Sequence, residues 1–91
     1  MGISMKRFKL GKVVATPGAL EQFGLLFVTE CIKRHASGDW GYVGPETGFE
    51  NDHADEGPDT IISVYNGKGG TLWVITEWDR SATTALLPEE Y

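Results

Sequence analysis

The sequence predicts one small α+β domain, in which a three-stranded antiparallel meander over about residues 60–87 packs on one or two N-terminal helices over about residues 17–36. Two observations lead to this class. The last third of the chain is made of β-branched and aromatic runs separated by turn residues. Residues 17–36 carry apolar side chains at helical spacing, between a Thr-Pro start and a Ser-Gly stop.

The size and composition of the chain fit one domain over residues 1–91, with residues 1–5 as a flexible N-terminal extension. With 91 residues, 41% of them hydrophobic, the chain can bury one thin core. The single cysteine, Cys31, excludes an internal disulfide and is expected to be buried and inert. No apolar run is long enough for a membrane span or a signal peptide, so we expect a cytoplasmic protein.

The N-terminal half is expected to begin with an edge strand or an extended arm at residues 8–15. Thr16 and Pro17 then start a helix, since threonine caps free amide groups and proline needs no hydrogen bond at the first helical position. Gly24 favours two helices, the second over residues 25–36, and one helix bent at this glycine is the alternative.

The middle of the chain, residues 39–58, is rich in glycine and proline. We expect a packed loop anchored by Trp40, Tyr42 and Phe49, because a long structureless loop is unusual in a compact domain. Residues 46–54 are expected to form one or two helical turns.

The meander is expected to consist of strands at residues 60–65, 71–78 and 82–87, joined by a five-residue glycine-rich hairpin loop and a second turn. Trp73 and Trp78 have opposite parity on the middle strand, so we expect them to point to opposite faces. The helices can cover only one face of the sheet. The other face is expected either to expose aromatic surface to a partner or to be covered by the chain's own loop.

Charge is unevenly distributed along the chain, whose net charge is −5. The first twelve residues are basic, whereas no lysine or arginine lies between Arg34 and Lys68. The carboxylates of this acidic middle are Asp39, Glu46, Glu50, Asp52, Asp55, Glu56 and Asp59. An acidic segment repels phosphate backbones, so we expect no direct nucleic-acid binding there. It suits a basic protein surface, or serves only as a solvated loop.

A serine, a histidine and an aspartate lie close together in the sequence as Ser37, His35 and Asp39. A catalytic triad needs side chains that converge from separate elements, whereas residues two apart on a helix end point in different directions. We therefore expect no catalytic residue. A small enzyme that uses His35, Asp39 and Arg80 is a remote alternative.

Metal and cofactor motifs are also weak. Two histidines and one cysteine are too few for a typical zinc site, and residues 51–59 do not match a calcium loop. The glycine-rich residues 66–70 lack the spacing of a phosphate-binding loop. We expect neither a metal nor a cofactor.

Several segments resemble a family of small bacterial proteins carried by plasmids, phages and integrated elements, usually described as plasmid-related or hypothetical. They are Thr16-Pro-Gly-Ala-Leu20, Arg34-His-x-Ser-Gly-Asp-Trp-Gly41, Asn51-Asp52, Trp73-Val-Ile-Thr-Glu-x-Asp-Arg-Ser81 and Thr83-Thr-x-Leu-Leu-Pro-Glu-Glu-Tyr91. The similarity spans nearly the whole chain from Phe8. This sequence departs from the family in its glycine-rich residues 41–48 and in Trp78. The resemblance carries no activity to any residue and implies only a setting, that of a mobile-element accessory protein.

In that setting we expect a non-enzymatic, protein-binding inhibitor of a host defence nuclease or CRISPR complex, of the anti-CRISPR or antirestriction kind. The alternative is a homodimeric plasmid maintenance or regulatory module, which would bury the bare sheet face in a symmetric interface. The residues expected to bind a partner are Asp39, Trp40, Glu50, Asp52, Asp55, Glu56, Trp73, Glu77 and Trp78. No membrane partner is expected.

Overall fold

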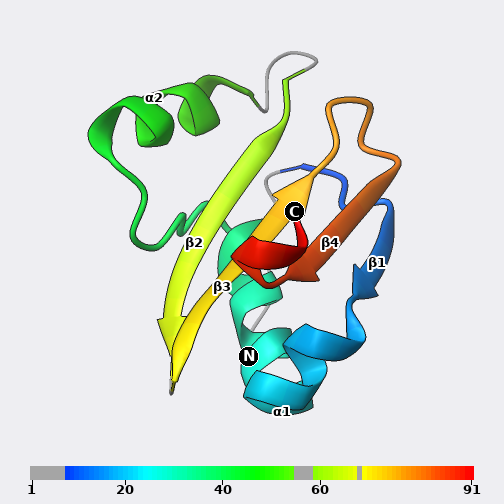
Figure 1. Cartoon of the computed structure of the whole chain (residues 1–91). Coiled ribbons are helices and arrows are strands. Elements are labelled where there is room, and N and C mark those ends of the chain that lie inside the picture. Colours follow the sequence, from blue (N-terminus) through cyan, green and yellow to red (C-terminus); the bar gives the residue numbers. More distant parts are fainter. Residues whose placement is uncertain (1–7, 55–58, 68) are drawn as a thin grey trace, which may run out of the picture.

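The computed structural model describes residues 8–54, 59–67 and 69–91, and it shows an α+β fold in which a helix lies against a mixed sheet (Figure 1). The sheet has the strand order β1-β4-β3-β2. Its strands are β1, Lys12–Ala15; β2, Ile61–Gly67; β3, Gly70–Thr76; and β4, Ala82–Leu86. Helix α1, Pro17–Ala36, covers one face, α2, Pro45–Ala54, lies beside β2, and the short helix η1, Pro88–Glu90, lies in front of β3 in the view of Figure 1. The predicted N-terminal extension lies outside the described residues.

The expected three-stranded antiparallel meander is only part of this sheet. Strands β2, β3 and β4 pair antiparallel as predicted, but β1 adds a fourth strand, parallel to β4. Its register places Lys12 beside Ala82 and Ala15 beside Ala85. The sequence offered residues 8–15 as an edge strand or an arm, and the structure forms the strand from their second half. The α+β class is confirmed, and the strand count is corrected.

The two turns of the meander also differ from expectation. Strands β2 and β3 pair as far as Gly67 and Gly70, so the loop between them is shorter than five residues. Strand β3 ends at Thr76, and Trp78 lies in the following turn. The parity argument, which placed Trp73 and Trp78 on opposite faces of one strand, is therefore wrong for Trp78.

Helix α1 follows the local signals closely. The Thr16 hydroxyl accepts a hydrogen bond of 3.1 Å from the amide of Ala19, as an N-cap should. Gly24 has φ 84° and ψ 157°, a conformation that favours glycine, and it divides α1 into two helical segments as predicted. Ser37 ends the helix, and its amide reaches the carbonyl groups of Lys33 and Arg34.

The core lies between α1 and the sheet. Its buried members are Ala19, Val28, Cys31, Tyr65, Leu72, Val74 and Ala85. Burial raises the pKa of the Cys31 thiol to about 11, so the thiol stays protonated at neutral pH, as expected for an inert core cysteine. A second cluster continues the core past the end of α1 and consists of Phe8, Trp40, Ala54 and Ile61.

The outer edge of β2 is covered by the chain between α1 and β2. Asn51 of α2 donates to the carbonyl of Ile62 at 2.6 Å and accepts from its amide at 3.2 Å. The amide and carbonyl of Val64 pair with the backbone of Trp40 and Tyr42. Gly41, at φ 73°, permits this approach, because a Cβ atom there would overlap the Val64 carbonyl.

Two expectations for the middle segment are corrected. Helix α2 has ten residues, longer than one or two turns. Of the three expected anchors only Trp40 is buried, whereas Tyr42 is 70% exposed and Phe49 is 65% exposed. None of the helices in the described ranges has the length and hydropathy that a membrane span requires.

Candidate functional site

The imidazole of His35 is fully buried at the end of α1, between the sheet and two aromatic rings. Nδ1 lies 2.5 Å from the Ser63 hydroxyl on β2, and Nε2 lies 2.8 Å from the Thr76 hydroxyl on β3. The rings of Phe8 and Trp40 pack edge-on against the imidazole at 5.4 and 5.8 Å. His35 therefore joins helix, sheet and second core cluster, and it has no exposed surface on which a substrate could dock.

The hydrogen-bond chain from His35 fixes its proton positions. Thr83 donates to the carbonyl of Leu10 at 2.7 Å, so its oxygen accepts from Thr76, 2.7 Å away. Thr76 must then accept from His35 Nε2–H, which leaves Nδ1 as an acceptor for Ser63. Each polar group is satisfied with a neutral imidazole, and burial lowers the pKa of His35 to about 4.

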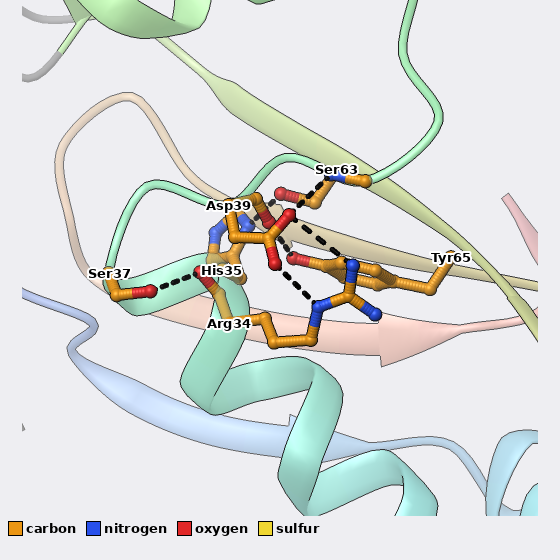
Figure 2. Close-up of polar contacts among 7 residues, drawn as sticks. Arg34, His35, Ser37, Asp39, Ser63 and Tyr65 are labelled. Atoms are coloured by element: carbon orange, nitrogen blue, oxygen red, sulfur yellow. Dashed lines mark hydrogen bonds and ion pairs between the residues drawn. The ribbon is translucent and has the colours of Figure 1, made fainter.

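Next to this network, Arg34 and Asp39 form an exposed ion pair across the end of α1 (Figure 2). Arg34 Nε lies 2.7 Å from the carboxylate, and the hydrogen bond from Arg34 lowers the pKa of Asp39. The guanidinium also lies over the Tyr65 ring, 4.7 Å from its centre, while the Tyr65 hydroxyl donates to the Asp39 carbonyl at 2.6 Å. Asp39 also accepts a hydrogen bond of 3.2 Å from the amide of Gly41. This arrangement holds the loop after α1 in place.

The guanidinium of Arg80 joins three segments at the other end of the second cluster. Nη2 donates to the carbonyl of Ala54 at the end of α2, at 2.6 Å. Nη1 donates to the carbonyl groups of Asp59, Glu77 and Trp78 at 2.7, 3.2 and 3.1 Å. The positive charge of Arg80 thus lies at the carbonyl end of α2, where it complements the helix dipole. It also lies inside the β3–β4 turn, where the guanidinium binds backbone carbonyl groups.

The backbone of Arg80 is unusual in the same place. Its φ of 59° makes it the one non-glycine residue with positive φ among the described residues. Such a turn normally carries glycine, and an L side chain there costs about 1–2 kcal/mol. The hydrogen bonds of the guanidinium offset this cost. We therefore infer that position 80 carries arginine because of these hydrogen bonds, although its backbone conformation favours glycine.

A hollow of about 460 Å³ opens beside this junction, between α2 and the start of β2. It is lined by Phe49, Glu50, His53, Asp59 and Thr60. Phe49 packs on His53 with ring centres 4.3 Å apart, and its other side is open to solvent. Glu50 and Asp59 are exposed, and within the described ranges neither carboxylate pairs with a lysine or arginine side chain. An aromatic ring beside two carboxylates is suited to a guanidinium or ammonium group.

The β3–β4 turn continues this surface. Trp78 is 57% exposed, and the flanking Glu77 and Asp79 are exposed as well. Arg80 Nη1 joins the backbone of Trp78 to that of Asp59, so the turn and the hollow lie side by side. We call this set the acidic–aromatic surface: Phe49, Glu50, Asp59, Glu77, Trp78 and Asp79.

The structure brings together some of the residues that the sequence nominated and separates others. Glu50, Glu77 and Trp78 lie on the acidic–aromatic surface. Asp55 and Glu56 lie outside the described residues. Trp40 is buried and donates to Asp52 at 2.9 Å, so its ring packs in the core and is not a contact surface.

The other nominated residues lie elsewhere. Asp39 pairs with Arg34 at the end of α1. Trp73 lies on the sheet face opposite α1, where Tyr91 packs edge-on against it at 5.5 Å and leaves it half-buried. That face is therefore partly covered by the C-terminal segment, which the sequence did not indicate.

The residues of the remote enzyme alternative do not form an open polar cluster. His35 is enclosed, Asp39 pairs with Arg34, and Arg80 is bonded to backbone carbonyl groups. The ring of Phe8 contacts both His35 and Arg80. Within the described part of the chain, no group of three or more histidine, cysteine or acidic residues is placed to hold a metal ion.

Sequence reasoning missed Arg80 as the residue that organises the surface and Phe49 as an exposed ring. The sequence does show an arginine in the turn between two predicted strands, where glycine is common. The signal could not be used, because the sequence alone does not reveal the type of this turn. A scan of the chain against protein-family models finds no match, and searches of curated proteins and of solved structures find none either.

Proposed function

We propose that this protein is a non-enzymatic accessory protein that binds the basic, nucleic-acid-binding surface of a protein partner, as an inhibitor of a host defence nuclease or CRISPR complex does. The observation that carries the proposal is the acidic–aromatic surface. Its exposed rings, Phe49 and Trp78, stand among exposed carboxylates. Tryptophan and aromatic anchors commonly dominate binding energy at interfaces, and surrounding charge sets partner choice and association rate.

The distribution of charge supports a basic partner. Exposed carboxylates occur on α2, just before β2 and in the β3–β4 turn, whereas the exposed Lys9 and Lys12 lie just before β1 and at its first residue, at the far edge of the sheet. Arg80 is half-buried in this region, and its guanidinium adds one positive charge that is hydrogen-bonded to backbone carbonyl groups. A negatively charged surface attracts a basic groove of the kind that binds phosphate backbones. The same surface repels nucleic acid itself.

The mobile-element setting, and with it a bacterial cytoplasmic location, comes from the resemblance of the sequence and remains part of the proposal. One feature of the fold supports the partner-binding proposal. The surface is held together by the half-buried guanidinium of Arg80 and is largely preformed, so binding would order few further residues.

A homodimeric maintenance or regulatory module is the second candidate. The observation that favours it is the open edge of β1, whose exposed Val13 and Val14 would be buried by a second copy.

The test is affinity capture from a bacterial host lysate with the wild-type chain, a Glu50→Lys/Asp59→Lys variant and a Glu89→Lys control. Glu89 is an exposed carboxylate near the C-terminus, outside the surface. We expect wild type and control to retain the same nucleic-acid-binding protein, the double variant to lose it, and added nucleic acid to compete. Capture of one partner equally by all three chains would refute the proposal.

A further inference from the structure

The two edges of the sheet are treated differently by the fold. The outer edge of β2 is occupied by Asn51 and by residues 40–42, which take up the outward amide and carbonyl groups of Ile62 and Val64. The other edge is β1. Its even-numbered amides face β4, as the bonds from Lys12 to the Ser81 carbonyl and from Thr16 to the Ala85 carbonyl show, both 3.0 Å.

The odd-numbered residues of β1 therefore point their backbone groups away from the sheet. Val13 and Ala15 contribute two amides and two carbonyl groups to this outer edge, and no hydrogen bond within the described ranges uses them. The side chains here are apolar, with Val13 49% and Val14 38% exposed on the two faces of the strand. Such an edge is a template for another strand.

We propose that a second copy of this chain pairs with β1 through its own β1, antiparallel and centred on Val14. Val13 then lies opposite Ala15 of the partner subunit, and the two Val14 residues face each other. All outward amide and carbonyl groups of both copies pair, and the sheets join into one. The twofold axis is perpendicular to the sheet, so both copies of α1 lie on the same face.

The neighbouring residues select this register over the next ones. A shift toward the N-terminus places Ala15 opposite Gly11, whose φ of 65° departs from strand geometry. A shift toward the C-terminus places Val13 opposite Pro17, which has no amide hydrogen to donate. Only the register centred on Val14 uses every outward group.

Charge supports the same register. Lys12 lies opposite Thr16 of the partner subunit, and in each copy the Thr16 hydroxyl donates to the Glu90 carboxylate at 2.6 Å. Lys12 and Thr16 have the same parity, so their side chains lie on the same face of the joined sheet. The ammonium group of Lys12 in one copy therefore faces the Glu90 carboxylate of the other copy, and the twofold symmetry repeats this pair. This inference rests on the same β1 edge as the second candidate function and gives that dimer its register, and it does not depend on the partner-binding function.

The first test measures the dimer dissociation constant by sedimentation across a concentration series. Val13→Pro removes one outward amide but none of the bonds between β1 and β4, and Val13→Thr is the control that keeps the amide. We expect a reversible wild-type dimer, a dissociation constant raised at least about tenfold by proline, and little change with threonine. Lys12→Glu should also weaken the dimer, whereas Lys9→Glu, the same change of charge outside the pairing, should not.

The second test uses cysteine trapping and does not require proline to be tolerated. Directly opposed residues of a non-hydrogen-bonded antiparallel pair have Cα atoms about 4.5 Å apart, within disulfide range. Val14→Cys should therefore form a disulfide between copies under mild oxidation, and Val13→Cys, offset by two residues, should not. The native Cys31 is 1% exposed and should not interfere. A wild-type monomer at all concentrations, or equal crosslinking by both variants, would overturn the proposal.

Discussion

Arg80 Nη1 donates a hydrogen bond of 2.7 Å to the main-chain carbonyl of Asp59, two residues before β2 begins. The same guanidinium binds the end of α2 and the turn that carries Trp78. The hollow beside Phe49 and the exposed tryptophan are therefore parts of one surface because one side chain joins their backbones.

This relationship predicts an order of stability among variants of Arg80. Arg80→Ala loses the charge-assisted hydrogen bonds and keeps an L residue at positive φ, so we expect a loss of about 2–4 kcal/mol in the free energy of unfolding. Arg80→Gly loses the same hydrogen bonds, but glycine adopts the positive φ at this position without the steric cost of a Cβ atom. It should therefore be about 1 kcal/mol more stable than the alanine variant. Urea denaturation measures both values. Equal stability of the two variants would show that φ at this position costs nothing.

Arg34→Ala is the matched control, since it also removes a guanidinium. Its ion pair with Asp39 is exposed, so the loss should stay near 1 kcal/mol or below.

The two tryptophans of the β3 region should respond differently to truncation. Trp78→Ala removes a side chain that is 57% exposed in a turn, so the free energy of unfolding should change by less than about 0.5 kcal/mol while partner binding falls. Trp73→Ala removes a half-buried ring and its contact with Tyr91, and should cost about 1–3 kcal/mol. Thermal unfolding and quantitative capture of the partner separate the two effects, and a large stability loss from Trp78→Ala would contradict the placement of its ring.

Stability should fall in mild acid because His35 is buried as a neutral ring. The pKa of His35 is lowered to about 4, below its ordinary 6.5, so between these values the unfolded chain binds a proton that the folded chain does not. The stabilisation is complete above pH 6.5 and is lost as the pH falls toward 4, by about 3 kcal/mol in total. Denaturant titrations from pH 7.5 to pH 4 measure this loss.

The loss has a second contribution from carboxylates whose pKa values are lowered by hydrogen bonds, including Asp39 and Asp79. His35→Gln, compared with wild type, isolates the histidine share and should flatten the dependence above pH 5. An unchanged slope in His35→Gln would show that His35 does not govern the transition.

The covered edge of β2 depends on Asn51, which is 2% exposed. Asn51→Ala leaves the amide and carbonyl of Ile62 without their partner, so we expect a loss of about 1–3 kcal/mol and faster exchange of the Ile62 amide hydrogen. Glu50→Ala, an exposed neighbour on the same helix, is the control and should leave both nearly unchanged. Unaltered protection of Ile62 in Asn51→Ala would contradict the observed pairing.

Local signals predicted the elements of this fold well, because they arise within a few residues. Thr16 caps α1 with its side chain, Gly24 interrupts it with a backbone conformation that favours glycine, and Ser37 ends it. The strands of the meander were predicted from their β-branched and aromatic content. The pairing of β1 with β4 was not predicted, because it joins residues about 70 positions apart and leaves no local pattern.

The candidate site was harder to predict for the same reason. Glu50, Glu77 and Trp78 were nominated from charge and aromatic content, but Trp40 has the same content and is buried against Phe8. Only the three-dimensional path of the chain distinguishes the exposed ring from the core ring. The role of Arg80 likewise depends on carbonyl groups from three separate segments, which no spacing in the sequence reveals.

The central claim is that the acidic–aromatic surface occupies the nucleic-acid-binding site of a basic partner. The most direct measurement is the affinity of the captured partner, once purified, for the wild-type chain and for Glu50→Lys/Asp59→Lys, by calorimetry with and without the partner's nucleic acid. We predict that the charge reversals weaken binding at least about tenfold and that nucleic acid and this protein exclude each other. Equal affinity of the two chains, or simultaneous binding of protein and nucleic acid, would contradict the account.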